Sequence, residues 1–127
     1  MNKGREILGG ILLAALGFAL PSFLATDGAP DPPGTKRVVL ENDRVRAQAI
    51  EYPPGARGGE HEHAYPRAVV VLEGGSLEIR DAGGGAKSLA VKSGDVLWRP
   101  AERHAITNTG TTAVRLVEID VLDCPPR

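Results

Sequence analysis

Aromatic residues and cysteine are both scarce in this chain. Aromatics make up 4% of the 127 residues, and two of them, Phe18 and Phe23, fall in the N-terminal segment. The core must therefore rest on valine, leucine, isoleucine and alanine. Cys124 is the one cysteine, so no disulfide can form within the chain. In an oxidising compartment this thiol stays free or pairs with a second chain.

An excess of charge is missing as well. The sequence has 15 basic and 16 acidic residues, for a formal net charge of −1. It contains no cluster of lysine and arginine interleaved with aromatic residues, so we expect no nucleic-acid partner. The length fits a single domain.

No hydrophobic run is long enough for an ordinary transmembrane helix. The longest runs from residue 7 to residue 20, short of the roughly 20 residues that cross a bilayer. Because a short basic segment precedes it, residues 1–25 are predicted to be a secretory signal peptide that ends at Ala25. An uncleaved N-terminal anchor helix is the alternative, since Phe23 occupies a position that prefers small residues. We expect an exported protein, periplasmic or extracellular, that meets a membrane only through an uncleaved leader.

The remaining chain has a β pattern. Residues 26–35 are rich in proline, glycine and aspartate and are interpreted as a linker. Short alternating or continuous apolar segments then follow, separated by glycine and proline. They predict strands at residues 37–41, 45–52, 68–72, 76–81, 89–91, 96–99 and 113–122. No segment after the leader has a capped helical period, so we predict an all-β sandwich or barrel.

The three histidines are the strongest functional signal. His61 and His63 form an H-x-H pair, and His104 is the one other histidine. Side chains alternate between the faces of a strand, so His61 and His63 point the same way and can bind one ion together. Neutral imidazoles suit zinc, copper, iron and nickel. Three such ligands leave positions open for water, substrate or dioxygen. The alternative is a set of polar residues in a metal-free pocket.

Residues flanking the histidines follow a pattern in two stretches. The first reads Gly55-(x5)-His61-x-His63-(x3)-Arg67-(x6)-Gly74, and the second reads Gly94-(x5)-Pro100-(x3)-His104-(x3)-Asn108. They resemble the two motifs of the cupin family, G-(x5)-H-x-H-(x3,4)-E-(x6)-G and G-(x5)-P-x-G-(x2)-H-(x3)-N. The chain departs from them in having Arg67 where the family has a glutamate ligand. In the second motif, Glu102 replaces glycine and His104 comes one residue early.

The resemblance covers residues 36–122 and implies one cupin domain over residues 36–127. The implied fold is a double-stranded β-helix, or jelly-roll, barrel that holds one small ligand at its mouth. The implied metal ligands are His61, His63 and His104. Fe(II) is the favoured ion, and zinc, nickel, copper and manganese are alternatives. The family also implies a homodimer.

Arg67 makes the predicted pocket more positive than the family pattern does. A guanidinium cannot ligate a metal, but it binds a carboxylate or phosphate through paired hydrogen bonds. We therefore predict that Arg67 binds a small anion as ligand or substrate. The alternative is an internal ion pair of Arg67 with Glu60 or Glu118. Glu102, expected in a loop near His104, is a less favoured replacement for the missing carboxylate ligand.

Two aromatic residues are further candidates for the pocket. Tyr65 shares the strand parity of His63, so its hydroxyl is a candidate acid or hydrogen-bond donor. An ordinary strand aromatic is the alternative. Trp98 is expected in the core or in the pocket wall, in contact with substrate.

Three functions stay open at this stage. The first is a metalloenzyme, because three-histidine cupins resemble thiol- and diketone-type dioxygenases that use Fe(II). The second is a non-catalytic module that binds a small molecule or a metal. The third is a metal-free isomerase that uses a histidine and Tyr65. The fold does not separate them, since function depends on the pocket.

Overall fold

The structure is a computed structural model that describes residues 33–123. The predicted leader, most of the predicted linker and Cys124 lie outside the described residues. The described segment contains β1 (Thr35–Glu41), β2 (Val45–Tyr52), β3 (Arg57–His63), β4 (Arg67–Glu73), β5 (Gly75–Asp81), β6 (Ala86–Val91), β7 (Val96–Arg99), β8 (Glu102–Asn108) and β9 (Val114–Val121). Residues 33–123 include no helix that is long and apolar enough to cross a membrane.

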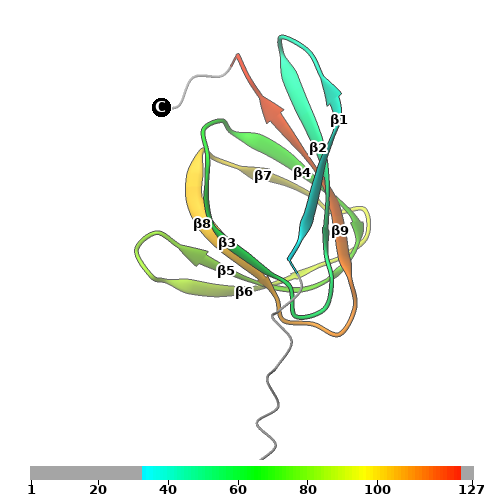
Figure 1. The fold of residues 1–127 in the computed structure, drawn as a ribbon, viewed down its shortest axis with the longest axis vertical. Coiled ribbons are helices and arrows are strands. Elements are labelled where there is room, and N and C mark those ends of the chain that lie inside the picture. The colour runs from blue at the N-terminus through cyan, green and yellow to red at the C-terminus, as the bar shows by residue number, and fades with distance from the viewer. Residues whose placement is uncertain (1–32, 124–127) are drawn as a thin grey trace, which may run out of the picture.

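The strands form two antiparallel sheets that face each other (Figure 1). The five-stranded sheet has the order β1-β2-β9-β4-β7, and the four-stranded sheet has the order β3-β8-β5-β6. Most neighbours within each sheet are distant in sequence, as in a jelly roll. The prediction of an all-β, double-sheet barrel is therefore confirmed.

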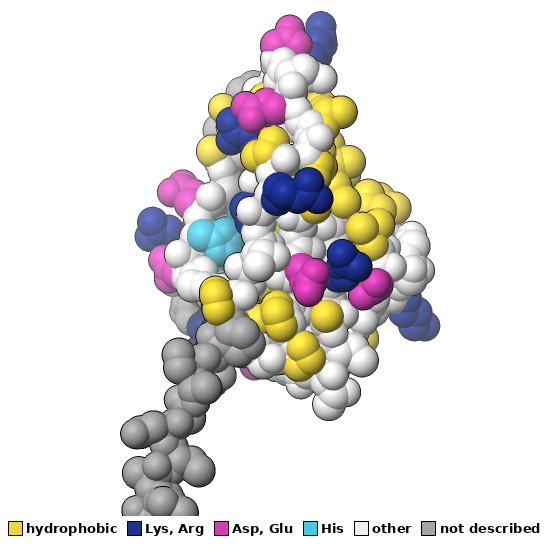
Figure 2. Space-filling view, turned by 45° about the vertical axis from the view of Figure 1, so that its right-hand side comes forward, with side chains coloured by type: hydrophobic (Ala, Val, Ile, Leu, Met, Phe, Trp, Pro, Cys, Tyr) yellow, Lys and Arg dark blue, Asp and Glu magenta, His cyan; other side chains and the backbone are white. Residues whose placement is uncertain are grey.

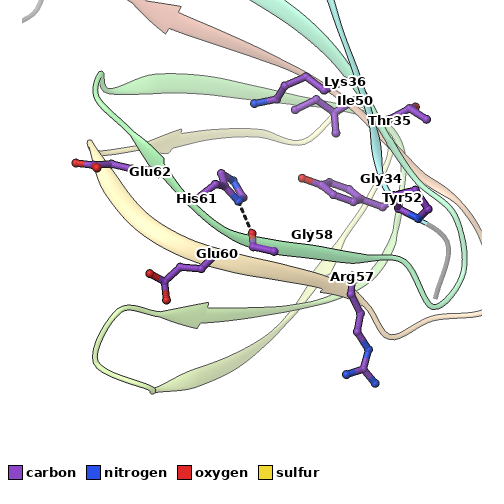
Figure 3. A pocket seen from close by; sticks show the side chains of 12 residues that line it. Gly34, Thr35, Lys36, Ile50, Tyr52, Arg57, Gly58, Glu60, His61 and Glu62 are labelled. Carbon is purple, nitrogen blue, oxygen red and sulfur yellow. Dashed lines mark hydrogen bonds between the residues drawn. The ribbon is translucent and has the colours of Figure 1, made fainter. Parts of the chain in front are cut away.

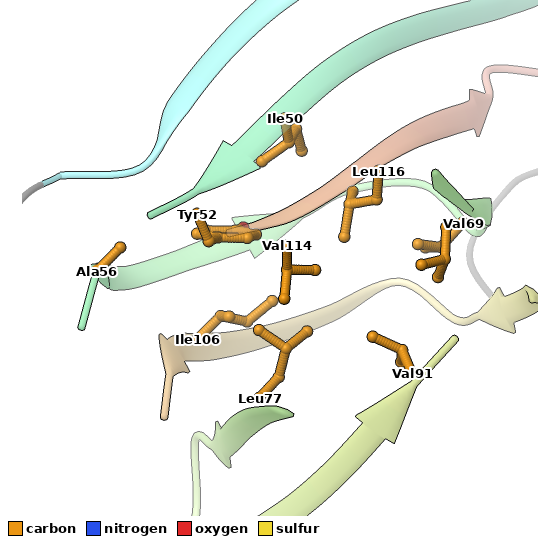
Figure 4. Close-up of a cluster of buried hydrophobic side chains, with 10 residues drawn as sticks. Ile50, Tyr52, Ala56, Val69, Leu77, Val91, Ile106, Val114 and Leu116 are labelled. Carbon is orange, nitrogen blue, oxygen red and sulfur yellow. The ribbon is translucent and has the colours of Figure 1, made fainter. Parts of the chain in front are cut away.

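The core lies between the two sheets. Leu116 and Val69 of the five-stranded sheet face Leu77, Val91 and Ile106 of the four-stranded sheet (Figure 4). Each comes from the inward-facing positions of an alternating strand. The cluster is aliphatic except for one tyrosine, and it comprises Ile50, Tyr52, Ala56, Val69, Val71, Leu77, Val91, Ile106, Val114 and Leu116.

The first glycine of each motif closes a turn of the same kind. Gly55 and Gly94 have φ angles of 77° and 90°, a left-handed conformation that glycine adopts without strain. Each is the third residue of a four-residue turn. The turns are closed by the amide of Ala56 donating to the Pro53 carbonyl at 2.9 Å and that of Asp95 donating to the Lys92 carbonyl at 3.0 Å. These glycines reverse the chain ahead of β3 and β7.

The apolar pattern predicts neither β3 nor β8, and only the H-x-H pair indicates a strand at His61 and His63. The expectation that Glu102 lies in a loop is wrong, because Glu102 is the first residue of β8. The strand is polar along much of its length, and His104 and Asn108 are buried there in place of apolar residues. This polar content conceals the period of two. β8 is nevertheless paired on both edges, with β3 and β5.

Candidate metal centre

The three histidines converge at one point on the four-stranded sheet. His61 and His63 lie on β3, and His104 lies on β8 as the direct cross-strand partner of His61. The ring centroids are 4.7 to 5.0 Å apart. One donor nitrogen of each ring lies within 4.8 Å of the others. Three side chains that can hold a single metal ion are therefore brought together, as the H-x-H spacing predicts for His61 and His63 and the cupin resemblance implies for His104.

A β-bulge brings His61 opposite His104. Gly58 pairs with Ile106, but the next pair is His61 with His104, so β3 carries one residue more than β8 between these points. Without the extra residue, Glu60 would lie opposite His104. His61 and His63 would then point to the other face of the sheet, because a shift of one residue turns every side chain over. The bulge falls at Gly59 and Glu60, and nothing lies within 4 Å of the position that a Cβ on Gly59 would take.

The ring nitrogens are arranged as metal ligands require. Nδ1 of His61 donates to the Gly59 carbonyl at 2.9 Å, which leaves its Nε2 as an electron-pair donor. Nε2 of His63 and both ring nitrogens of His104 are buried without a hydrogen-bond partner. Buried polar atoms without partners are uncommon and call for an explanation. A metal ion at the centre of the cluster would give one nitrogen of each ring a partner, so these residues fit such an ion.

Burial keeps the two inner histidines neutral. Desolvation, reinforced by the charge of Arg67, lowers the pKa of His63 to about 3. Desolvation also lowers the pKa of His104 to about 4, although Glu102 opposes this shift. Both rings are therefore uncharged at neutral pH, which is the state that binds a metal.

Glu102 lies behind His104 rather than in the ligand cluster. Its Oε1 is 3.3 Å from Nδ1 of His104. The same carboxylate accepts hydrogen bonds from Arg99 at 2.9 and 2.8 Å and from Arg67 at 3.0 Å. Burial alone would raise the pKa of Glu102, but these bonds lower it overall. Within the described residues the donor cluster holds histidines alone. Glu102 therefore lies beside Nδ1 of His104, the place from which carboxylates orient metal-binding imidazoles.

Arg67 faces the interior as predicted, but protein groups already occupy it. The residue is 1% exposed. Nε donates to Glu118 at 3.4 Å, Nη1 to the Pro100 carbonyl at 3.0 Å and Nη2 to Glu102 at 3.0 Å. The geometry thus favours the alternative of an internal ion pair with Glu118. Binding of a ligand by Arg67 stays a prediction that this geometry does not support.

A cleft opens beside His61, between β1 and β2 on one side and β3 on the other. Its volume is about 480 Å³, within the range of small-molecule sites. Its walls include Lys36, Ile50, Tyr52 and His61 (Figure 3). Figure 2 shows a histidine side chain, in cyan, at the surface of the molecule. His61 is the one of the three that is not buried, so the centre is reached from this side.

Other spaces near the histidines are smaller. The cavity between the sheets, lined by His104, Arg67 and core aliphatic residues, has a volume of about 30 Å³, which is room for about one water molecule. A hollow of about 270 Å³ beside β6 also reaches His104. The cleft is therefore the largest of these spaces and the one that His61 lines.

Tyr65 and Trp98 do not line this cleft. Tyr65 lies in the connection between β3 and β4 and is 36% exposed. The prediction that Tyr65 points to the same side as His63 assumes that the strand continues to Tyr65. This assumption is wrong, because β3 ends at His63. The expectation of Trp98 in the core or pocket wall is also wrong. Trp98 is 62% exposed, because Leu97 and Arg99 take the inward-facing positions of β7.

Sequence reasoning missed Tyr52 and Lys36 as cleft residues. Tyr52 is the last residue of an alternating strand, so its inward direction follows from the period of β2. Lys36 lies on β1, where every residue is exposed and the burial pattern gives no direction. Its pairing with the buried Ile50 shows that it faces inward. Glu118, which the sequence predicts only as a partner of Arg67, faces inward on β9 and also lies 3.8 Å from Nζ of Lys36.

Comparison with known proteins agrees with this geometry. The family model described as "Cupin domain" matches residues 48–120. No curated protein is significantly similar to the chain. A solved cupin domain from Bordetella pertussis Tohama I is 27% identical, has a TM-score of 0.69, and is aligned over 74% of this chain and 98% of its own.

More distant structures share the fold alone. The polyketide cyclase RemF of Streptomyces resistomycificus is 22% identical with a TM-score of 0.59, aligned over 76% of this chain and 70% of its own. The DMSP lyase DddQ of Ruegeria pomeroyi DSS-3 is 18% identical with a TM-score of 0.57, over 72% and 48%. The family match, the two-sheet fold and the histidine cluster on β3 and β8 together show that the chain belongs to the cupin family.

Proposed function

We propose that this cupin binds one divalent transition metal ion, with iron(II) favoured, through His61, His63 and His104. We propose further that it acts on a small anionic molecule in the adjacent cleft, as an oxidoreductase of the dioxygenase type. The observation that supports this most directly is the set of buried imidazole nitrogens without partners beside a cleft of about 480 Å³.

The ligand set favours an anionic substrate. Three neutral imidazoles leave the charge of a divalent ion uncompensated, and no carboxylate from the described residues joins the cluster. With three protein ligands, such an ion would have room for a group of the substrate as well. When bound, iron would supply Lewis acidity and one-electron reactivity towards dioxygen. The protein's own part is to hold the rings of His63 and His104 neutral, to place Glu102 beside His104 and to admit substrate past His61.

The fold does not choose the reaction. A cyclase and a lyase share it at low identity, and the same barrel hosts unrelated chemistries. The metal and its reactivity have to be measured. Binding without turnover would make the protein a non-catalytic module, and activity that survives chelation would make it a metal-free isomerase.

The deciding experiment is elemental analysis of the protein, purified without added metal or an affinity tag that contains histidine. We expect near-stoichiometric iron in the parent and its loss in a His61→Ala/His63→Ala variant. Glu62→Gln is the matched control, because Glu62 lies between the two histidines and points away from the cleft (Figure 3). It should keep its metal. Oxygen uptake with small carboxylate substrates then tests the redox assignment.

Two results would count against the proposal. Absence of metal from the parent, with no uptake on reconstitution, would remove the metal centre. Equal metal content in the parent and the double variant would place the ion elsewhere.

We also propose export, with residues 1–25 removed as a signal peptide or kept as an anchor. The support is the sequence pattern of that segment alone. Cell fractionation with N-terminal sequencing of the mature protein checks it. Recovery of the protein in the cytoplasm with an intact N-terminus would contradict it.

We propose in addition that the protein is a homodimer, as the family resemblance implies. The outward-facing side chains of β2, β4, β7 and β9 are almost all apolar. This outer sheet face comprises Val45, Ala47, Ala49, Ala68, Val70, Val96, Trp98, Val117, Ile119 and Val121. At its margin Arg115 lies between Glu51 and Glu73. A second copy would therefore meet an apolar face with both signs of charge at its rim, and no like-charged field would repel it.

A further inference from the structure

Some side chains that line the cleft point into the cavity and others point away from it. Only the first kind can contact a ligand there. In Figure 3, Glu60, Glu62 and Arg57 extend away from the cavity, whereas Lys36 extends across it near His61. Glu60 is paired with Arg103 at 3.2 Å, outside the cleft. Lys36 is also close enough to His63 to influence its pKa. Of the charged groups drawn, Lys36 is therefore the one that faces the histidine side of the cleft.

Lys36 has hydrogen-bonding capacity to spare. Its nearest anionic partner is Glu118, with Nζ and Oε2 3.8 Å apart, which is too long for a hydrogen bond. The Lys36 side chain is 44% exposed and Glu118 is 4% exposed. The buried carboxylate therefore attracts the ammonium towards the cleft without using its three N–H donors. A ligand anion can take those donors while Glu118 continues to hold Lys36 in place.

Tyr52 supplies a second donor on the same wall. Its ring packs in the core, and its hydroxyl points into the cavity towards His61 (Figure 3). In the part of the chain that the structure describes, the hydroxyl makes no hydrogen bond to another residue. Burial, with the negative charge of Glu118, raises the pKa of Tyr52 far above its ordinary value of 10.0. The phenol thus keeps its proton at neutral pH and can donate it in a hydrogen bond to an anion.

The two donors face the metal site from the opposite sheet. Lys36 and Tyr52 belong to β1 and β2, whereas the histidines belong to β3 and β8. Ile50 gives the wall between them an apolar surface. A small organic molecule with a carboxylate at one end could therefore contact the donors through that group and present its other end to the histidines.

We infer that Lys36 and Tyr52 form the anion-binding subsite of this cleft and select small organic carboxylates, in place of Arg67. The inference rests on the proposed function for the position of the metal. The contacts of Lys36 and Tyr52 with a carboxylate do not depend on that metal. It corrects the sequence-based choice of the anion-binding residue. Arg67 is buried and donates to Glu118, Glu102 and a backbone carbonyl, whereas Lys36 and Tyr52 line the cavity.

Calorimetric titration of the full-length protein tests this inference. The probes are acetate, propionate and benzoate, each compared with its uncharged amide, on the zinc-loaded and the metal-free protein. We expect each carboxylate to bind the parent more tightly than its amide. Lys36→Met and Tyr52→Phe should each weaken carboxylate binding roughly tenfold or more. Lys36→Arg should keep most of the affinity, and amide binding should change little in all three.

Lys92→Met is the matched control, because Lys92 is an exposed lysine in the turn after β6. It should bind carboxylates as the parent does. Metal content and thermal stability of every variant are measured first, so that a loss of metal or of fold is not read as a loss of the subsite.

Three outcomes would overturn the inference: equal binding of carboxylates and amides by the parent, failure of the parent to bind any carboxylate, or unchanged affinity in Lys36→Met. Failure of the metal proposal is a separate result. The metal-free titration reports on Lys36 and Tyr52 alone, and preference for carboxylates there would stand even if the protein never holds a metal.

Discussion

Arg67 is a buried charged residue that makes three hydrogen bonds within the protein. Its guanidinium lies between Glu118 of the five-stranded sheet and Glu102 of the four-stranded sheet, and so joins the two halves of the barrel through charge-assisted hydrogen bonds. Its partner Glu102 also lies 3.3 Å from Nδ1 of His104. Arg67 thus holds Glu102 next to the histidine cluster and is not one of its donors.

Replacement of Arg67 by methionine should destabilise the fold. The change leaves Glu118 buried with no partner closer than Lys36. Loss of one member of a buried ion pair costs about 3–5 kcal/mol of the free energy of unfolding. Urea denaturation measures it. Adding Glu118→Leu to the variant should recover much of the loss, because the unpaired carboxylate is then gone.

Arg103→Met provides the comparison for Arg67→Met. Arg103 and Glu60 form a pair in which both side chains are 56% exposed, and such surface pairs contribute about 1 kcal/mol or less. A loss in Arg67→Met no larger than that in Arg103→Met would show that the buried network does not stabilise the protein.

At the scale of the strands, the sequence predicts most elements because their inward positions are apolar. β2, β4, β5 and β9 alternate or run as aliphatic segments, and their observed bounds lie close to those expected. The histidine pair on β3 was also interpretable, since H-x-H places both rings on one face of any strand. What escaped was β8, whose inward positions include His104 and Asn108. Hydropathy does not distinguish a buried polar residue, such as His104 or Asn108, from an exposed one.

The register of β3 was equally beyond the sequence. The bulge between Gly58 and His61 decides that His61, and not Glu60, lies opposite His104, and bulges leave no reliable pattern in composition. The direction of Lys36 has the same origin, because it depends on how an exposed edge strand pairs with β2. Residue types near the site were thus predictable, whereas the anion-binding wall required the pairing of distant strands.

The last glycine of the first motif has a structural role that can be tested. A Cβ on Gly74 would collide with the Val91 carbonyl oxygen and lie 2.7 Å from Cα of Lys92. Both obstacles are backbone and cannot rotate away. Gly74→Ala should therefore push the β4–β5 connection away from the end of β6 and lower the free energy of unfolding by about 2–3 kcal/mol.

Gly59→Ala is the control for Gly74→Ala, because a Cβ there would meet nothing within 4 Å. Thermal unfolding should show a small shift for Gly59→Ala and a large decrease for Gly74→Ala. Similar stabilities for the two variants would mean that the close approach of the strands at Gly74 relaxes without cost.

At the scale of the molecule, the outer sheet face is apolar, although it is the other face of the five-stranded sheet that packs on the core. Val96 and Trp98 are 66% and 62% exposed on the outer sheet face. Figure 2 shows hydrophobic side chains, in yellow, gathered in a band along the right of the molecule. Contiguous exposed apolar surface is unusual in a monomer and marks an interaction site. The continuous apolar run of β4 predicts a strand that is covered on both faces. Within residues 33–123, other elements cover its inner face only.

If a second copy supplies that cover, Trp98 is the residue most able to anchor it, because large aromatic side chains dominate the energetics of interfaces. Trp98→Lys should turn the dimer into a monomer by weakening association roughly thirtyfold or more, measured by light scattering coupled to size-exclusion chromatography. Tyr65→Lys is the control, since it also replaces an aromatic residue by lysine but lies outside the outer sheet face. A parent that is monomeric at tens of micromolar, or a Trp98→Lys variant as dimeric as Tyr65→Lys, would reject the homodimer. The histidine cleft opens between the sheets and not on this face, so the monomeric variant should keep the metal content of the parent.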